Sequence, residues 1–304
     1  MMPRKQRTSA ASSKAEPHAN MDPSREWELS NQHSREVLAG GRFEFGRNWR
    51  RFLRLIDEHR VRAAAESLQS MLETVRLDGK TFLDIGSGSG LFSLAACTLG
   101  ARVHSFDYDP ESVWCTRYLK EKFAPDAEWT IEQGSVLDPG YLGTLGHFNV
   151  VYSWGVLHHT GRMWSALENV VPLVGPGGKL FIAIYNDQGS VSKRWRALKR
   201  LYNRSPRVLK SLVSLPVFVY QESRAVLGDL LRGKNPLTRW RRKSCSRGMS
   251  RWRDWIDWVG GYPFEVAKPE AIFEFYRTRG FTLTKLRTQG GSLGCNEYVF
   301  EKAG

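Results

Sequence analysis

Apolar residues recur at helical spacing between Asn48 and Arg76, and this pattern predicts one long amphipathic helix or two shorter ones. The pair Asp78-Gly79 follows and favours a turn that ends the helical segment. Residues 26–78 are therefore predicted to form an N-terminal helical cap. The apolar positions are Trp49, Phe52, Leu53, Ile56, Val61, Ala64, Ala65, Leu68, Met71, Leu72 and Val75.

Short apolar runs then alternate with helical segments. Continuous apolar strands separated by helices are typical of a parallel sheet that is covered on both faces. This pattern predicts an α/β core over residues 79–189. Helices are expected near residues 91–99, 111–123 and 163–171. The expected strands are 81–85, 102–106, 129–133, 149–153 and 179–185.

The alternation stops after Asn186. Residues 190–262 keep helical periodicity but are basic and rich in tryptophan, which indicates a helical insertion. Residues 263–304 are predicted to complete the core. They contain an expected helix at 269–279 and expected strands at 281–287 and 296–300, and the short glycine-rich connection between these strands predicts an antiparallel pair at the edge of the sheet.

The bulk composition is that of a globular protein. The chain has 304 residues, of which 41% are hydrophobic and 25% are charged, enough for a substantial core. The longest apolar stretches, such as residues 212–219, are too short to span a bilayer. The four cysteines show no CxxC spacing, so neither a metal site nor a disulfide framework is expected, and the predicted location is cytoplasmic.

Positive charge is unevenly distributed along the chain. The net charge is +14, and the stretch 190–253 holds about 18 lysine and arginine residues against two acids. Such a local excess favours acidic partners. The first 25 residues are basic and lack the apolar core of a signal peptide, so residues 1–25 are predicted to be a disordered tail, with a transit peptide as the alternative.

The stretch LDIGSGSGLF at 83–92 carries the first chemical signal. Gly86, Gly88 and Gly90 follow an expected strand, and such a loop brings backbone amides close to a ligand. A dinucleotide fingerprint would place its third glycine at position 91, which is leucine here. Asp107 lies 21 residues after Gly86, at the expected end of the second strand, where an acid can accept both ribose hydroxyls. Together these features predict a cofactor that contains adenosine.

As a set, these motifs resemble the class I S-adenosylmethionine (SAM)-dependent methyltransferases. The resemblance covers about residues 81–187 and lies nearest the methyltransferase type 11/12 group, including small-molecule O-methyltransferases of the ubiquinone-biosynthesis type. It implies a Rossmann-like, seven-stranded, mostly parallel sheet with an antiparallel edge strand, and SAM as the cofactor. The matching segments are LDIGSGSG at 83–90, Asp107, QGSVLD at 133–138, FNVVYSWGVLHH at 148–159 and GPGGKLFIAIYN at 175–186.

The resemblance also implies a set of cofactor-binding residues. The glycine loop would pass the methionine moiety, Asp84 would hold its ammonium group, and Asp107 would bind the ribose. Many relatives have aspartate where this chain has Ser135, which leaves open how the adenine amino group is recognised. Alternatively, Gly90 serves helix packing, and Asp109 is expected to cap the following helix. The implied residues are Asp84, Gly86, Ser87, Gly88, Gly90, Asp107, Tyr108, Ser135, Val136, Ser153 and Trp154.

Candidates for the acceptor side follow the fourth and fifth strands. His158 and His159 are candidate general bases, because histidine titrates near neutral pH and the acceptor of this family lies after the fourth strand. The alternative is that they start a helix or pack in the core. The sequence does not indicate which of the two histidines would be the base. Tyr185, Asn186 and Asp187 are candidate substrate contacts, or else a turn that starts the insertion.

The predicted function is methyl transfer to a small or lipid-like acceptor, with oxygen as the preferred acceptor atom. Phe43, Phe45 and Trp49 are expected, by analogy with the family, to contribute to a lid. The alternatives are an RNA methyltransferase and a SAM-binding protein without catalysis.

The insertion leaves the partner open. Its stretch 239–258 mixes arginine with tryptophan, a composition that suits RNA, an anionic membrane surface at the inner face of the membrane, or an apolar helix face packed on the domain. An amphiphilic acceptor and peripheral membrane contact through residues 190–258 are preferred over RNA. The tryptophans are Trp240, Trp252, Trp255 and Trp258.

Overall fold

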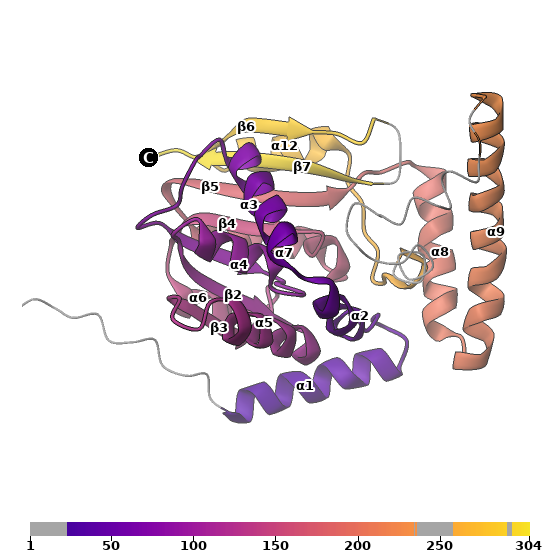
Figure 1. The fold of residues 1–304 in the computed structure, drawn as a ribbon, viewed down its shortest axis with the longest axis horizontal. Helices are drawn as coiled ribbons and strands as arrows, with labels where there is room; N and C mark the ends of the chain where they lie inside the picture. The colour runs from indigo at the N-terminus through magenta and orange to yellow at the C-terminus, as the bar shows by residue number, and fades with distance from the viewer. Residues whose placement is uncertain (1–22, 234, 236–257, 291–293) are drawn as a thin grey trace, which may run out of the picture.

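The computed structural model describes residues 23–233, 235, 258–290 and 294–304 (Figure 1). Seven strands form a single sheet in the order β3-β2-β1-β4-β5-β7-β6. The predicted Rossmann-like, mostly parallel sheet is confirmed. The predicted antiparallel pair at the edge of the sheet is confirmed as β7 and β6, with β6 outermost and β7 antiparallel to β5. The strands are β1 (Thr81–Ile85), β2 (Arg102–Asp107), β3 (Trp129–Gln133), β4 (Phe148–Trp154), β5 (Val174–Tyr185), β6 (Phe281–Arg287) and β7 (Cys295–Lys302).

Helices cover both faces of the sheet, as the continuous apolar strands require. On one face, Phe82 of β1 lies in a core with residues of α3, α4 and α5. On the other face, its neighbour Leu83 lies in a core with residues of α6, α7 and α12. Successive residues of a strand point to opposite faces, so each central strand supplies both cores. These helices are α3 (Glu58–Leu72), α4 (Leu91–Thr98), α5 (Pro110–Phe123), α6 (Pro139–Leu145), α7 (Met163–Val170) and α12 (Pro269–Arg277).

The N-terminal cap is divided into three helices and a short 3₁₀ turn. For residues 48–76, the prediction of two shorter helices is confirmed and that of one long helix is not. The backbone of Ile56 is extended and interrupts the helical segment. The Asp57 carboxylate then accepts from the Arg60 N–H at 2.8 Å and caps the start of α3. Val75 is exposed and lies beyond the end of α3, so its assignment to the apolar helix face is wrong. The elements are α1 (Pro23–Leu38), α2 (Gly46–Phe52) and η1 (Leu53–Leu55).

The predicted tail overlaps this cap. Helix α1 begins at Pro23, inside the predicted range 1–25, and residues 1–22 lie outside the described part of the chain. Helix α6 has no counterpart among the predicted elements, since it is seven residues long and contains two glycines. Two 3₁₀ turns, η2 (Leu157–His159) and η3 (Val171–Leu173), flank α7.

The first part of the insertion, residues 190–231, forms two helices that stand side by side beyond the carboxyl ends of the parallel strands (Figure 1). Helix α8 (Ser190–Arg204) faces the body of the protein, and α9 (Arg207–Leu231) lies on its outer side. Within the ranges that the structure describes, no helix is long and apolar enough to cross a membrane. Of the tryptophans singled out for partner contact, Trp240, Trp252 and Trp255 lie outside those ranges and Trp258 lies inside them.

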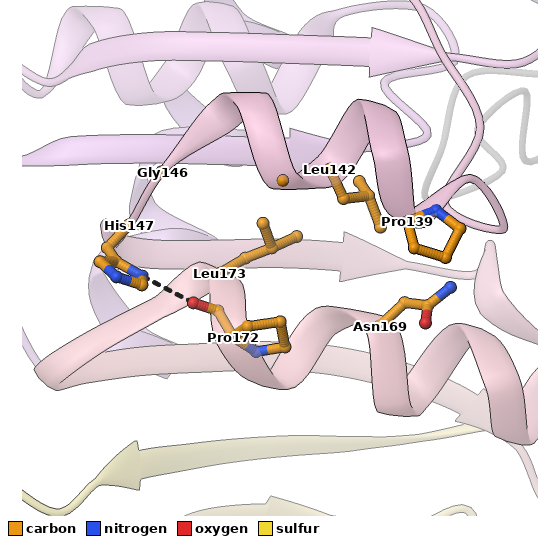
Figure 2. Close-up of a pocket in the computed structure, with 8 residues that line it drawn as sticks. Pro139, Leu142, Gly146, His147, Asn169, Pro172 and Leu173 are labelled. Carbon is orange, nitrogen blue, oxygen red and sulfur yellow. Dashed lines mark hydrogen bonds between the residues drawn. The ribbon is translucent and has the colours of Figure 1, made fainter.

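A shallow pocket lies between α6 and the segment from α7 to η3 (Figure 2). The Nδ1 atom of His147 lies 2.7 Å from the Pro172 carbonyl oxygen at one end of it. His147 directly precedes β4, so this end of the pocket lies at the amino end of that strand. Another lining residue, Asn169, donates to the carbonyl of the predicted site residue Val136 at 2.9 Å.

Candidate cofactor and acceptor site

The glycine loop after β1 is a turn that other residues cannot easily form. Gly86, Gly88 and Gly90 have φ angles of +79°, +57° and +82°. A Cβ atom on Gly86 would lie 2.4 Å from a methyl group of Val156, and one on Gly88 would lie 3.0 Å from the Trp49 indole. The turn therefore needs glycine both for its backbone conformation and for space.

The carboxyl groups of Asp84, which is buried, and Asp107, which is partly buried, lie beside this turn. Asp107, at the end of β2, accepts from the N–H groups of Gly88 and Asp109, each at 2.9 Å. Asp84, in β1, accepts from the Ser93 hydroxyl at 2.5 Å. Burial raises the pKa of each carboxyl to about 7, and a neighbouring acid adds to each shift. A ligand that brings positive charge to the turn would stabilise both carboxylates.

Tyr108 follows Asp107 and is held by the N-terminal cap. Its hydroxyl donates to the Glu36 carboxylate at 3.1 Å, and the Arg42 guanidinium lies 4.8 Å above its ring. Two further predicted residues follow β3: the Ser135 hydroxyl oxygen accepts from the Leu137 N–H at 3.2 Å in a local turn, and Val136 is buried.

Helix α2 and the loop before it lie over the same edge of the sheet. The Gly46 N–H donates to the Asp109 carboxylate at 2.7 Å, and Asp109 also caps α5 as expected. Trp49 lies against Gly88, and the Phe45 ring is 5.0 Å from the His159 ring. Phe43 packs on Phe45 at 4.9 Å. The predicted lid residues thus span the distance between the glycine turn and the histidines.

Ser153 and Trp154 end β4 but lie differently. The Ser153 hydroxyl donates to the Ile85 carbonyl at 3.0 Å, which ties β4 to β1 directly before the glycine turn. The Trp154 indole N–H donates to Glu297 at 2.9 Å, on the far side of β5. The structure therefore brings Ser153 to the turn, whereas the Trp154 indole reaches to β7.

His158 and His159 form a buried pair whose ring centres are 4.5 Å apart. The Nδ1 atom of His159 lies 2.5 Å from the Pro263 carbonyl, which can only accept, so this nitrogen carries the proton and Nε2 keeps its lone pair. The Nδ1 atom of His158 instead accepts from the Tyr185 N–H at 3.3 Å, which places the proton of the neutral ring on Nε2. The two histidines thus present opposite hydrogen-bonding character.

Burial keeps both histidines neutral. Burial lowers the pKa of His159 to about 3, and it lowers the pKa of His158 well below the usual range, with the charges of His159 and Lys199 adding to the shift. Each ring is therefore a neutral imidazole at the start of any proton transfer, across the whole physiological pH range.

Lys199 of α8 is a charged residue of this region that sequence reasoning missed. Its ammonium group donates to the Trp258 carbonyl and lies 4.1 Å from the Trp258 ring centre and 4.9 Å from that of Phe264. Burial lowers the pKa of Lys199 to about 7. The available signal was its position, four residues after Trp195 and three before Tyr202, on the inward face of the helix.

The residues after β5 divide between two roles. The Tyr185 ring lies 4.1 Å from His158 and 5.1 Å from Phe264, within the buried aromatic group. Asn186 accepts from the Asn296 side chain at 3.1 Å, and Asp187 accepts from the Gly189 N–H at 2.8 Å. The Asp187 contact is that of a turn that starts the insertion, the Asn186 contact reaches β7, and Tyr185 lies against the histidines.

Comparison with known proteins identifies the domain. The family model described as "Methyltransferase domain" matches residues 83–180, which include the glycine turn, Asp107 and both histidines. A ubiquinone biosynthesis O-methyltransferase from Xanthomonas oryzae pv. oryzae is 32% identical over 115 residues, covering 37% of this chain and 47% of that protein. Residues 83–180 therefore form a domain of the class I SAM-dependent methyltransferase type. Its cofactor is SAM.

Other relatives of the methyltransferase carry different names. A ribosomal protein L11 methyltransferase from Helicobacter hepaticus is 28% identical over 169 residues, 49% of this chain and 52% of that protein. The solved N-methyltransferase NodS from Bradyrhizobium japonicum, in complex with S-adenosyl-L-homocysteine, has 15% identity and a TM-score of 0.47, covering 85% of this chain and 98% of that one. The methyltransferase spans about half the length of the curated relatives it matches.

The residues around the glycine turn fit SAM chemically. The turn is a cradle that a Cβ atom would fill, and the carboxyls beside it match the charges and hydroxyls of the cofactor. On this basis Asp107 remains the predicted partner of the ribose, and Asp84 that of the ammonium group. Within the described ranges, no group of three or more histidine, cysteine, aspartate or glutamate side chains is arranged to hold a metal ion.

SAM binding by the methyltransferase is expected to weaken as the pH falls through 7. Both carboxyls have a raised pKa of about 7, so they become protonated below it and lose their attraction for a cationic cofactor. Each proton that SAM binding must displace lowers the affinity by about tenfold per pH unit. Isothermal titration calorimetry at pH 8 and pH 6 should show at least about tenfold weaker binding at pH 6, and equal dissociation constants would contradict this electrostatic account.

Proposed function

We propose that the protein transfers the SAM methyl group to a hydroxyl oxygen of a small or lipid-like acceptor, with His159 as the proton acceptor. When bound, SAM supplies an electrophilic methyl carbon. The observation that carries the proposal is the Nδ1–H of His159 on the Pro263 carbonyl, since it leaves Nε2 as the basic nitrogen. A hydroxyl needs such a base to become a good nucleophile.

The surroundings of His159 favour an acceptor with apolar or aromatic parts. Phe45 lies 5.0 Å from the His159 ring, Tyr185 lies 5.5 Å from it, and Phe264 packs on Tyr185. Phe264 is buried, and Phe45 and Tyr185 are partly so. A site with neutral bases and aromatic walls stabilises a neutral, apolar acceptor better than a charged one.

Residues of the cap would fix the position of the histidine segment relative to the predicted cofactor site. Arg42 donates to the His159 carbonyl at 3.2 Å and to Glu36 at 2.8 Å, and its guanidinium lies over Tyr108. One side chain thus connects the histidine segment to the residue predicted to flank the adenine. Methyl transfer depends mainly on alignment of the acceptor with the methyl group, and positioning of this kind contributes about 7–11 kcal/mol in favourable cases.

Oxygen as the acceptor atom is also supported by the relatives. Those at about a third identity are named as ubiquinone biosynthesis O-methyltransferases. The name of the ribosomal protein L11 methyltransferase gives a protein acceptor instead. The two names differ in acceptor, and the neutral imidazole of His159 is the observation that favours the hydroxyl.

The test offers SAM labelled on its methyl group to the purified protein together with lipid, RNA and water-soluble fractions from the cells that encode it. We expect the label in the lipid or soluble fraction, in a product whose methyl group is stable to mild base as an ether is. Label in RNA would replace the proposal with RNA methylation. Calorimetric binding of SAM with no label in any fraction would indicate a SAM-binding protein without catalysis.

A further inference from the structure

Within the described ranges, helix α9 packs on the rest of the protein through the face that meets α8. Val213, Val217 and Phe218 are half-buried and Ser214 is buried along this face, which packs on α8. Figure 1 shows α9 as the outermost element of the molecule, next to α8 and beyond the carboxyl ends of the parallel strands. The other side of the helix faces away from the protein.

That outward side is apolar, contrary to the pattern of a helix on a water-facing surface. The spacing of Val208, Leu212, Leu215 and Val219 is four, three and four residues, which places them in one row along the helix. Their exposed fractions are 82%, 66%, 50% and 57%. Leu230 continues the row at the end of the helix and is exposed as well. We call these five residues the outer row of α9.

Basic side chains lie on the same helix pair as the outer row, most of them on α8. Residues 190–232, which comprise α8, α9 and their ends, contain ten lysines and arginines against two acids, Glu222 and Asp229. Several of the basic side chains are exposed, and these are Lys193, Arg194, Arg200, Arg204 and Arg232. The helix pair therefore combines an apolar stripe with strong positive charge.

We propose that the α8–α9 pair docks on an anionic lipid bilayer. Helix α9 would lie in the plane of the interface, with its outer row at the boundary of the acyl chains and the basic side chains at the headgroups. Its 25 residues give a length of about 37 Å at 1.5 Å per residue, which is enough for a stable interfacial contact. The basic charge selects anionic over zwitterionic lipid.

Charge complementarity argues against two other occupants of the outer row. A second copy of the chain would bring ten further basic residues against the same face. The segment 236–257 of this chain contains seven basic residues and two acidic ones, so it would also add like charge. An anionic bilayer offers an apolar layer and compensating charge at once.

Docking in this way would place the histidine site near the membrane. The inner face of α8 carries Lys199, whose charge contributes to the lowered pKa values of both histidines. The inference goes beyond the proposed methyl transfer and does not depend on it, since lipid binding requires no turnover. A failure of one therefore leaves the other unchanged.

The test is co-sedimentation of the full-length protein with vesicles of phosphatidylcholine alone or mixed with phosphatidylglycerol. Binding is expected only to the mixed vesicles and should decrease at high salt. The variant L212S/L215S should bind at least about tenfold more weakly, because each change removes a side chain buried in the interface. Its matched control is L38S/V75S, which alters two exposed apolar residues outside the helix pair and should bind like the wild type.

A second pair of variants tests the charge. R200Q/R204Q should weaken binding and reduce its salt dependence. K80Q/R102Q changes two exposed basic residues at the amino ends of β1 and β2, away from the helix pair, and should change neither. Circular dichroism shows whether each variant is folded. No binding of the wild type to anionic vesicles, or equal binding of L212S/L215S, would overturn the proposal. A dimer that L212S/L215S abolishes without any effect on vesicle binding would assign the outer row to a second copy.

Discussion

Replacing Asp107 with alanine is expected to weaken SAM binding at least a hundredfold. The carboxylate lies at the end of β2 and accepts from Gly88, so its loss removes the predicted ribose partner and one bond that shapes the glycine turn. Hydrogen bonds to a charged group contribute about 1.5–3 kcal/mol each, and two ribose hydroxyls therefore correspond to a factor of about a hundred or more. Calorimetry at pH 8, where the carboxyl is ionised, measures the change.

Two variants separate ligand contact from general damage. Asp107→Asn keeps one acceptor oxygen, and we expect an affinity between those of the wild type and D107A. Asp126→Ala removes an exposed carboxylate after α5 and should bind SAM like the wild type. Binding by D107A within about threefold of the wild type, a difference of less than 1 kcal/mol, would show that Asp107 does not hold the ribose.

The strands were predictable because each is a short apolar run between glycines or charges. The predicted bounds of β1, β3 and β6 agree with the structure. Strand β2 ends one residue later than predicted, β4 is longer by one residue at each end, and β7 begins one residue earlier and ends two residues later. Strand β5 was predicted to begin at Lys179 because the Gly-Pro-Gly-Gly stretch before it is typical of a turn. The strand begins at Val174, which pairs with Phe148 of β4. A strand start that contains glycine and proline is visible only through its partner strand.

The cofactor side of the site was predictable for the same reason. Asp84, the glycine turn and Asp107 end adjacent parallel strands, so the sheet topology alone brings them together. Trp154 was not predictable in this way. Its indole contacts Glu297, which lies 143 residues later in the chain, and this contact depends on β7 inserting next to β5.

The difference between the two histidines could not come from the sequence either. It rests on a carbonyl of Pro263 and an amide of Tyr185, both from distant segments that carry no side-chain signal. The burial of Lys199 likewise depends on Trp258 and Phe264, which lie on either side of the end of the insertion and contact α8. Backbone groups from the ends of an insertion determine the character of this side of the site.

Replacing His159 with asparagine is expected to lower kcat at least a hundredfold at saturating SAM, with the dissociation constant of SAM unchanged within about threefold. The asparagine amide can still donate to the Pro263 carbonyl, as Nδ1 of His159 does, but it has no counterpart of Nε2. The variant therefore removes the proposed base while keeping the contact that positions it. Transfer of labelled methyl to the acceptor found in the fractionation experiment measures kcat.

His147→Asn is the matched control, because the Nδ1 atom of His147 also contacts a proline carbonyl, Pro172, at 2.7 Å, but at the amino end of β4 (Figure 2). It should leave kcat unchanged.

The pH profile adds a second criterion. The pKa of His159 is lowered to about 3, so its neutral, basic form persists as the pH falls, and kcat of the wild type should stay level from pH 8 to about pH 5. A loss of kcat centred near pH 6.5, or full activity in H159N, would exclude His159 as the buried proton acceptor.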